Sequence, residues 1–343
     1  MTNKKSTIKD IARETGLSIA TVSRVINKKE GHYNERTEKI VNEAIERLNY
    51  NPNIGAINLK KQKTRTIGFV APELDSFYSE LFLGSQDFAF KNKYSTFLFN
   101  TNYNQNLEEL QIENLLNRRV DGVIIASGLI NNKLVYRLLE NNIPVVLIEN
   151  FINDPNIPKV ILDNYKYSKM AVNHLIEKGY RYIGYLSGPI EEMHTLRGRY
   201  KGYMDALKEN KIVYDENIVF FDKRLRGKWD LDGARALIEE ICLAKKKLDA
   251  LFIISDIVAQ IALRVITKLG YRIPNDIGVM GFDDRRMSKN SVISLSSVFQ
   301  PKYEMGAMGM KLLLDNIEGR NGGEKNIHLE MKLAIRESTN RVI

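Results

Sequence analysis

Residues 7–27 read TIKDIARETGLSIATVSRVIN, and this stretch predicts two short helices joined by a tight turn. Apolar residues recur in each half at i, i+3 and i+4, the spacing of one buried helical face: Ile8, Ile11 and Ala12, then Val22, Val25 and Ile26. Gly16 stands where the first helix must end in a left-handed residue. Thr7, with Asp10 three residues on, and Ser18 are suited to capping the two helices. The stretch therefore predicts a helix-turn-helix.

The polar face of the second helix carries the functional information. Ile19, Ala20, Thr21, Ser23 and Arg24 lie near its start or on the side that its apolar stripe leaves free. Short side chains and an arginine at the start of a second helix suit the major groove of DNA. An ordinary helical hairpin in a small core is the alternative. A third helix, capped by Asn34, completes a small three-helix core.

Charge is concentrated at this end of the chain. Residues 1–65 hold fourteen Lys and Arg against seven Asp and Glu, a net charge of +7 out of +9 for all 343 residues. A basic head on a near-neutral body is typical of a protein with one end on phosphate. A single cysteine excludes an internal disulfide framework. We expect a cytoplasmic protein, because we find neither a secretory signal pattern nor an apolar run of membrane-spanning length.

From residue 66 onward, short apolar runs alternate with helical patterns. They form two successive series, 67–71, 96–99, 122–126, 145–148 and 160–162, then 182–186, 218–221, 250–254 and 277–282. Nearly continuous apolar strands between helices predict parallel sheets that are covered on both faces. Two series of similar length predict two lobes. Ligands of such sheets bind at the carboxyl ends of the strands, here between the lobes.

Residues 7–27, followed by Tyr50-Asn51-Pro52-Asn53 and Ala56-Ile57-Asn58-Leu59, resemble the amino-terminal head of the lactose/galactose repressor (LacI/GalR) family. The resemblance continues through the whole chain and implies a periplasmic-binding-protein-like sensor. Residues 53–59 match the family's hinge helix, which we expect to order only on DNA because so short a helix is unstable alone. The resemblance implies these DNA contacts: Thr7, Ser18, Ile19, Ala20, Thr21, Ser23, Arg24, Asn27, Asn53, Ala56 and Leu59, the last as a minor-groove wedge.

The resemblance also implies an effector site in the cleft. Arg199 matches the arginine that clamps effector hydroxyls or carboxylates, and Asp283 matches the acid that accepts hydrogen bonds from sugar hydroxyls. The full predicted set is Phe77, Glu149, Arg197, Arg199, Trp229, Ser255 and Asp283. For each residue a structural role, as salt bridge, cap or core aromatic, is the alternative. The sequence shows no phosphate loop, nucleophile–His pair or metal-ligand spacing, so we expect no enzyme, metal or cofactor.

The predicted organisation is a head over 1–51, a hinge and linker over 52–65, and a two-lobed domain over 66–343. We expect the N-lobe at about 66–162 and 295–322, and the C-lobe at about 163–293 and 323–340. The implied function is a homodimeric repressor of a carbohydrate-utilisation operon, controlled by a sugar-like effector, on near-palindromic operator DNA. The alternatives are a free-standing sugar-binding protein and a corepressor-dependent regulator of a non-sugar pathway.

Overall fold

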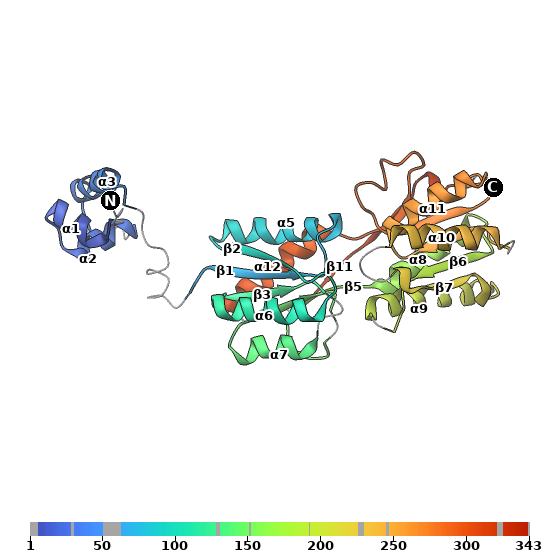
Figure 1. The fold of residues 1–343 in the computed structure, drawn as a ribbon, viewed down its shortest axis with the longest axis horizontal. Helices are drawn as coiled ribbons and strands as arrows, with labels where there is room; N and C mark the ends of the chain where they lie inside the picture. Colours follow the sequence, from blue (N-terminus) through green and yellow to red (C-terminus); the bar gives the residue numbers. More distant parts are fainter. Residues whose placement is uncertain are drawn as a thin grey trace. The chain divides into compact units, whose positions relative to one another are not determined.

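The computed structural model describes residues 6–28, 31–50, 63–127, 131–150, 152–191, 193–225, 230–244, 247–320 and 325–341. The chain divides into two compact units, residues 1–64 and residues 65–343, which we call the head and the sensor (Figure 1). The predicted hinge residues Asn53, Ala56 and Leu59, and the predicted effector contact Trp229, lie outside the described residues.

The head contains the predicted helix-turn-helix and a third helix: α1 (Ile8–Thr15), α2 (Ile19–Ile26) and α3 (Glu35–Arg47). Gly16 ends α1 with φ of 70°, in the left-handed region. The Ser18 hydroxyl oxygen accepts the Thr21 amide hydrogen at 3.0 Å, and Asn34 caps α3 in the same way. The core of the head is a small cluster centred on Ile11, Val22, Val25, Val41 and Ala44.

The first lobe of the sensor is built on a six-stranded sheet of order β11-β5-β4-β3-β1-β2, in which all the pairings are parallel. Its strands are β1 (Thr66–Ala71), β2 (Ser95–Asn100), β3 (Gly122–Ile125), β4 (Val145–Ile148), β5 (Lys159–Leu162) and β11 (Asn326–Leu329). Its helices are α5 (Ser76–Lys91), α6 (Gln105–Arg118), α7 (Asn132–Glu140) and α12 (Lys302–Ile317). Figure 1 shows α5 and α12 on one face of this sheet, and α6 and α7 on the other.

The second lobe repeats this design on a sheet of order β12-β10-β9-β8-β6-β7, with one antiparallel pairing, β10 with β12. Its strands are β6 (Ile183–Ser187), β7 (Val219–Phe221), β8 (Ala250–Ile253), β9 (Gly278–Asp283), β10 (Ser296–Phe299) and β12 (Lys332–Ala334). Its helices are α8 (Asn164–Glu177), α9 (His194–Glu209), α10 (Leu231–Leu243) and α11 (Asp256–Lys268). Three short 3₁₀ helices complete it: η1 (Glu216–Ile218), η2 (Lys223–Leu225) and η3 (Glu337–Thr339).

Two of the three predicted crossings between the lobes are misplaced. The sequence assigns 295–322 to the first lobe, but β10 pairs with β9 and therefore belongs to the second. It assigns 323–340 to the second lobe, but β11 pairs with β5 in the first. The crossings follow β5, β10 and β11. The error arises because a crossing needs only a few residues, such as Gln300 and Pro301, so it can lie on either side of a strand without changing the apolar pattern of the sequence.

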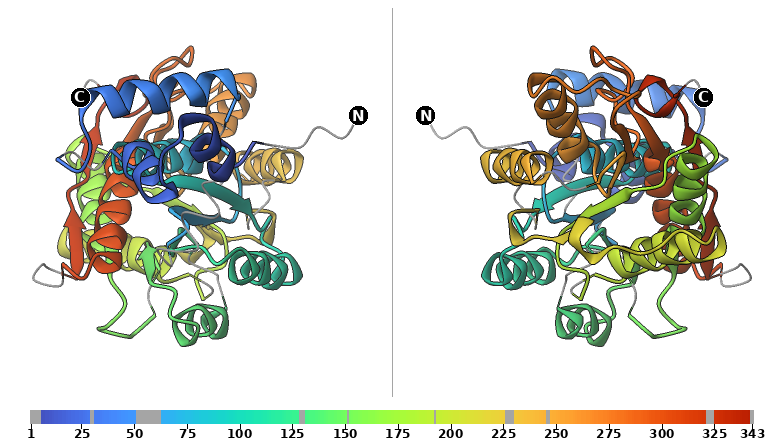
Figure 2. Two further views of the ribbon diagram at one scale, coloured as in Figure 1. Left: turned by 90° about the vertical axis from the view of Figure 1, so that its left-hand side faces the viewer. Right: turned by 90° about the vertical axis from the view of Figure 1, so that its right-hand side faces the viewer.

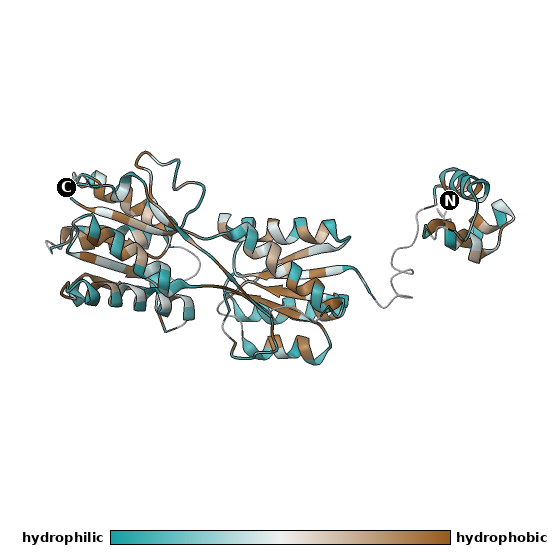
Figure 3. Cartoon of the chain, turned by 180° about the vertical axis from the view of Figure 1, so that it is seen from behind, coloured by the Kyte–Doolittle hydropathy of each residue, from teal (hydrophilic) through white to brown (hydrophobic). Residues whose placement is uncertain are grey.

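Hydrophobic residues are concentrated on the strands, and hydrophilic residues cover much of the helices (Figure 3). The end-on views in Figure 2 show helices on both sides of the sheet strands. This burial explains why the strands read as continuous apolar runs. No helix in the described part of the chain combines the length and apolar character needed to cross a membrane.

Candidate functional site

The head presents the polar face of α2 to solvent. Ile19 is 46% exposed, and Ala20, Arg24 and Asn27 are also exposed, whereas Thr21 and Ser23 are half-buried. Arg24 forms no ion pair with any described residue. The hydroxyls of Thr21 and Ser18 lie 2.9 Å apart and hydrogen-bond to each other. The exposed arginine is therefore available to an external partner.

Two more of the predicted DNA contacts make local hydrogen bonds. The Thr7 hydroxyl donates to the Asp10 carboxylate at 2.7 Å, and the Thr7 amide donates to the same oxygen at 2.9 Å. The Asn27 amide nitrogen donates to the Ser23 carbonyl oxygen at 2.7 Å. These bonds fix the two ends of the helix-turn-helix, and the exposed Thr7 and Asn27 remain at its surface.

A cavity of about 130 Å³ lies in the sensor between the two lobes. Its first-lobe wall is made by residues at the carboxyl ends of β1 and β2, namely Glu73, Phe77, Tyr78 and Tyr103. Its second-lobe wall includes Arg199, Ser255, Asp283 and Arg285, and Gln300 follows β10 at the crossing. The position agrees with the rule that open α/β sheets bind ligands outside the carboxyl ends of their strands.

Arg199 projects from α9 and is nearly buried, with 8% of the residue exposed. Its Nε donates to Asn164 Oδ1 at 2.8 Å and its Nη1 to the Ile254 carbonyl oxygen at 3.0 Å. The guanidinium carbon lies 3.7 Å from the centre of the Phe282 ring, a cation–π contact. Burial lowers the pKa of Arg199, and the nearby Asp283 carboxylate opposes this shift. Arginine nevertheless stays charged in proteins, so the wall carries a fixed positive charge.

Asp283 ends β9 with φ of 122°, a left-handed conformation that is strained for any residue but glycine. One carboxylate oxygen accepts Arg285 Nε at 2.9 Å, and the other accepts Gln300 Nε2 at 2.8 Å. Arg285 also pairs with Asp75 of the first lobe. Burial lowers the pKa of Arg285, but the carboxylates of Asp283 and Asp75 outweigh burial, so the pKa is raised overall.

Ser255 lines the cavity, and its hydroxyl is buried without a hydrogen-bond partner among the described residues. It occupies the N-cap position of α11, yet its side chain makes no cap hydrogen bond. An unpaired buried hydroxyl costs about 1–3 kcal/mol. A ligand that hydrogen-bonds this group would remove that cost.

Two of the predicted effector contacts do not line the cavity. Arg197 is exposed, and its Nη1 donates to the Glu191 carbonyl oxygen at 2.7 Å. Glu149 instead accepts the Leu162 amide hydrogen and Asn164 Nδ2, each at 2.7 Å. Burial raises the pKa of Glu149 to about 7, although these hydrogen bonds lower it. Asn164 thus hydrogen-bonds to both Glu149 and Arg199, whose opposite charges also attract each other.

Sequence reasoning missed Asp75, Tyr103, Arg285 and Gln300. Tyr103 donates its hydroxyl to Glu73 at 3.1 Å. Asp75 caps α5 just after β1, where its position at a strand's carboxyl end was an available signal. No periodic pattern shows that Arg285 turns inward while its neighbour Arg286 stays exposed. Only the folded loop reveals this difference.

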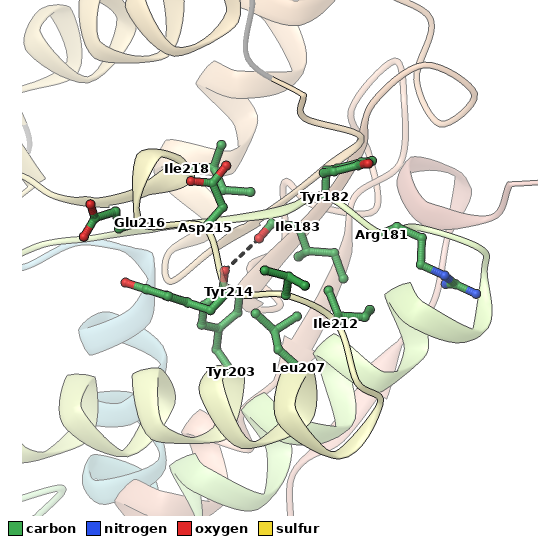
Figure 4. A pocket seen from close by; sticks show the side chains of 11 residues that line it. Arg181, Tyr182, Ile183, Tyr203, Leu207, Ile212, Tyr214, Asp215, Glu216 and Ile218 are labelled. Carbon is green, nitrogen blue, oxygen red and sulfur yellow. Dashed lines mark hydrogen bonds between the residues drawn. The ribbon is translucent and has the colours of Figure 1, made fainter.

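A larger pocket, of about 540 Å³, lies in the second lobe near the start of β6 and the end of α9 (Figure 4). It is lined mainly by aromatic and aliphatic side chains, including Tyr182, Tyr203 and Tyr214. The Tyr203 hydroxyl donates to the Ile183 carbonyl oxygen at 2.8 Å, the dashed line in Figure 4. The Tyr214 hydroxyl lies 3.2 Å from that of Tyr200. Because this pocket lies at the start of β6 rather than at the carboxyl ends of the strands, it is a weaker candidate than the cleft.

Comparison with known proteins agrees with both units. Residues 7–53 match the family of bacterial regulatory proteins of the lacI type. Residues 64–330 match the periplasmic binding proteins and sugar-binding domain of the LacI family. Catabolite control protein A of Priestia megaterium is 35% identical over 337 residues, which cover 97% of this chain and 99% of the relative.

Solved structures extend the likeness to the full chain. The lac repressor dimer bound to operator and the anti-inducer ONPF is similar with a TM-score of 0.85 and 25% identity, over 98% of this chain and 99% of that chain. A complex of the transcriptional regulator CelR with cellobiose has a TM-score of 0.73 and 29% identity, over 97% and 100%. The family and these relatives are transcriptional regulators, and the chain belongs to the LacI family of DNA-binding regulators.

Proposed function

We propose that the protein is a cytoplasmic, homodimeric repressor of genes for carbohydrate use, whose affinity for operator DNA is set by a small sugar-like effector in the cleft. The observation that carries this proposal is the cavity between the lobes, where Arg199, Ser255 and Asp283 converge. A few polar groups that fix orientation within a partly apolar wall are typical of a site for a small polar ligand. Phe77 supplies an aromatic face for a sugar ring.

The exposure of α2 supports the DNA contacts proposed for the head. In this proposal Ile19, Ala20 and Arg24 read base edges in the major groove, and Thr21 and Ser23 contact phosphates. Thr7, Ser18 and Asn27 lie at helix ends, where hydroxyl and amide groups reach the DNA backbone. In the hinge, Asn53, Ala56 and Leu59 follow the family pattern for the minor groove.

A homodimer is supported by an apolar face on the second lobe. A groove of about 1000 Å³ is lined by parts of α10, α11 and residues 287–293. Val292 is fully exposed, and Leu231 and Met287 are each about half exposed. Exposed apolar patches of this kind mark interaction sites. A twofold dimer places two heads on two half-sites, so we expect a near-palindromic operator.

Selection from random duplex DNA with the full chain tests the DNA-binding part of the proposal. We expect enrichment of one near-palindromic motif. A panel of pentoses, hexoses, disaccharides, sugar acids and sugar phosphates is then added while fluorescence anisotropy reports DNA binding. A ligand can shift this equilibrium only by its differential affinity for the two states, so release and tightening both reveal an effector. Failure to enrich any motif would contradict the regulator, and a silent panel would contradict the sugar class.

Arg199→Ala locates the effector site in the same assay. We expect the variant to keep its affinity for the selected DNA and to lose the response to the effector. Because the substitution also unpairs the buried Asn164 and Ile254 oxygens, Arg199→Lys provides a second variant that keeps the charge. A wild-type effector response in both variants would remove Arg199 from the site.

A further inference from the structure

Arg285 crosses the cleft from the second lobe to the first. Its side chain is only 5% exposed, and its guanidinium pairs with Asp283 of its own lobe and with Asp75 of the other. Its Nη1 also lies 3.4 Å from the hydroxyl oxygen of Ser76, in the first turn of α5. The guanidinium thus joins the carboxyl ends of β1 and β9 from inside the effector cavity.

Asp75 is positioned to receive this cation. One of its carboxylate oxygens accepts the amide hydrogens of Phe77 and Tyr78, at 2.9 and 3.1 Å, and so caps α5. The other oxygen pairs with Arg285. The Phe77 ring lies beneath the guanidinium, with 5.7 Å between the guanidinium carbon and the ring centre. The first lobe therefore contributes two groups to the binding of this guanidinium: a carboxylate that helix capping already holds in position, and an aromatic ring.

The backbone of Arg285 is equally well fixed. Its amide donates to Asp256 at 2.9 Å, and the same buried carboxylate accepts the hydroxyls of Ser288 and Ser297 at 2.5 and 2.6 Å. Asp256 thereby holds the loop that follows β9 against β10. An arginine on an anchored loop loses little further freedom when it pairs, unlike a flexible surface arginine.

The cavity beside Arg285 is correspondingly small. Its volume of about 130 Å³ is well below the ~300–1,000 Å³ of common ligand sites. The carboxylate of Asp283, which faces this cavity, already accepts hydrogen bonds from Arg285 and Gln300. Two of the roughly four acceptor positions of this carboxylate are therefore already used before a ligand binds.

We propose that Arg285 is an interlobe latch, an internal occupant of the cleft that holds the two lobes together in the absence of effector. A ligand that hydrogen-bonds to Asp283 would compete with Arg285 for that carboxylate, and so would act on the residue that joins the lobes. The effect of a ligand on Arg285 rests on the proposed effector site. The proposal that Arg285 holds the ligand-free lobes together does not.

The distance between the lobes in the ligand-free full chain tests the latch. Spin labels are attached at Lys133→Cys on α7 and Lys208→Cys on α9, two exposed positions in different lobes, in a Cys242→Ala background. Labelled protein is mixed with an excess of unlabelled protein so that each dimer carries one labelled copy. Double electron–electron resonance spectroscopy then gives the distribution of distances between the two spin labels within one chain.

Arg285→Ser should shift this distribution toward longer or more widely spread distances than those of the doubly labelled protein that keeps Arg285. Arg286→Ser is the matched control, because it removes the same side chain from the adjacent exposed position and should leave the distribution unchanged. Asp75→Asn is a second variant: asparagine still caps α5, but it no longer carries the charge that Arg285 pairs with. We expect it to shift the distances in the same direction as Arg285→Ser.

Unchanged distributions in both Arg285→Ser and Asp75→Asn, or an equal shift in Arg286→Ser, would overturn the latch. The measurement contains neither DNA nor effector. A failure to bind DNA or to respond to sugars would therefore count against the proposed function alone, and an unshifted distance would count against the latch alone.

Discussion

The polar face of α2 in the head and the wall of the cleft in the sensor differ in how their side chains are used. On α2, Ile19, Ala20 and Arg24 are exposed. In the cleft, Arg199, Asp283 and Arg285 are buried and bonded to other groups of the chain. The head thus presents its groups directly to a partner, whereas a cleft ligand must exchange existing bonds for new ones. The polar face of α2 is therefore suited to binding a partner directly. The wall of the cleft is suited to coupling the binding of a ligand to a rearrangement of the two lobes.

The small core of the head gives the largest expected effect. Ile11→Ala should cost about 2–5 kcal/mol, comparable with the ~3–5 kcal/mol that a core of this size supplies. We expect loss of DNA binding in the full chain, while thermal unfolding of the sensor stays unchanged. Ile40→Ala is the control, because Ile40 lies on α3, is 37% exposed and is not among the predicted DNA contacts, so its loss should leave the head folded and DNA binding intact. Retained DNA binding by Ile11→Ala would show that the sensor stabilises the head.

Arg24→Ala tests whether the exposed face of α2 reads bases. Loss of a base contact should cost about 1–3 kcal/mol, or roughly 5- to 150-fold in affinity for the selected operator at fixed salt. Arg47→Ala removes the same charge from α3, where the guanidinium pairs with Glu14 at 3.0 Å, and should weaken binding less. Equal losses in the two variants would mean that Arg24 contributes only general electrostatic attraction. Titrations by fluorescence anisotropy decide between these outcomes.

We expect Glu149 to make the stability of the sensor sensitive to pH. Its folded-state pKa is raised to about 7 from an ordinary value of 4.5, mainly by burial. Between these values the folded state holds more protons than the unfolded state, so stability falls as the pH rises through this window. The contribution is on the order of 2–3 kcal/mol. Denaturant unfolding at pH 5 and pH 8 should show a smaller decrease for Glu149→Gln; an equal decrease would assign the pH dependence to other groups.

Ser255→Ala should have the smallest effect, with opposite signs for stability and binding. Removing the unpaired buried hydroxyl should leave the ligand-free sensor as stable or more stable. Loss of one hydrogen bond to the effector should weaken its binding by about 0.5–1.5 kcal/mol, measured by calorimetry. Ser168→Ala is the control, since that hydroxyl is also buried and unpartnered among the described residues but does not line the cavity. Equal effector affinities in the two variants would exclude Ser255 from the site.

The local half of the fold was predictable because its signals are short-range. Gly16, Ser18 and Asn34 act within a few residues of their own position, and each has the conformation or cap that its residue type favours. The apolar strands of the sensor were likewise visible as continuous runs. The crossings after β10 and β11 were not, because strand pairing depends on the neighbour in space rather than on the strand's own residues.

By itself, the sequence determined a basic helix-turn-helix, an exposed polar face on its second helix and a parallel two-lobed sensor. Caps, turns and the periodicity of apolar residues encode these features locally. Only the tertiary structure decided that Arg197 lies outside the cleft, that Glu149 hydrogen-bonds to Asn164, and that Arg285 rather than Arg286 joins the lobes. These outcomes depend on burial and on partners far away in the chain, such as Asp75, which lies 210 residues from Arg285.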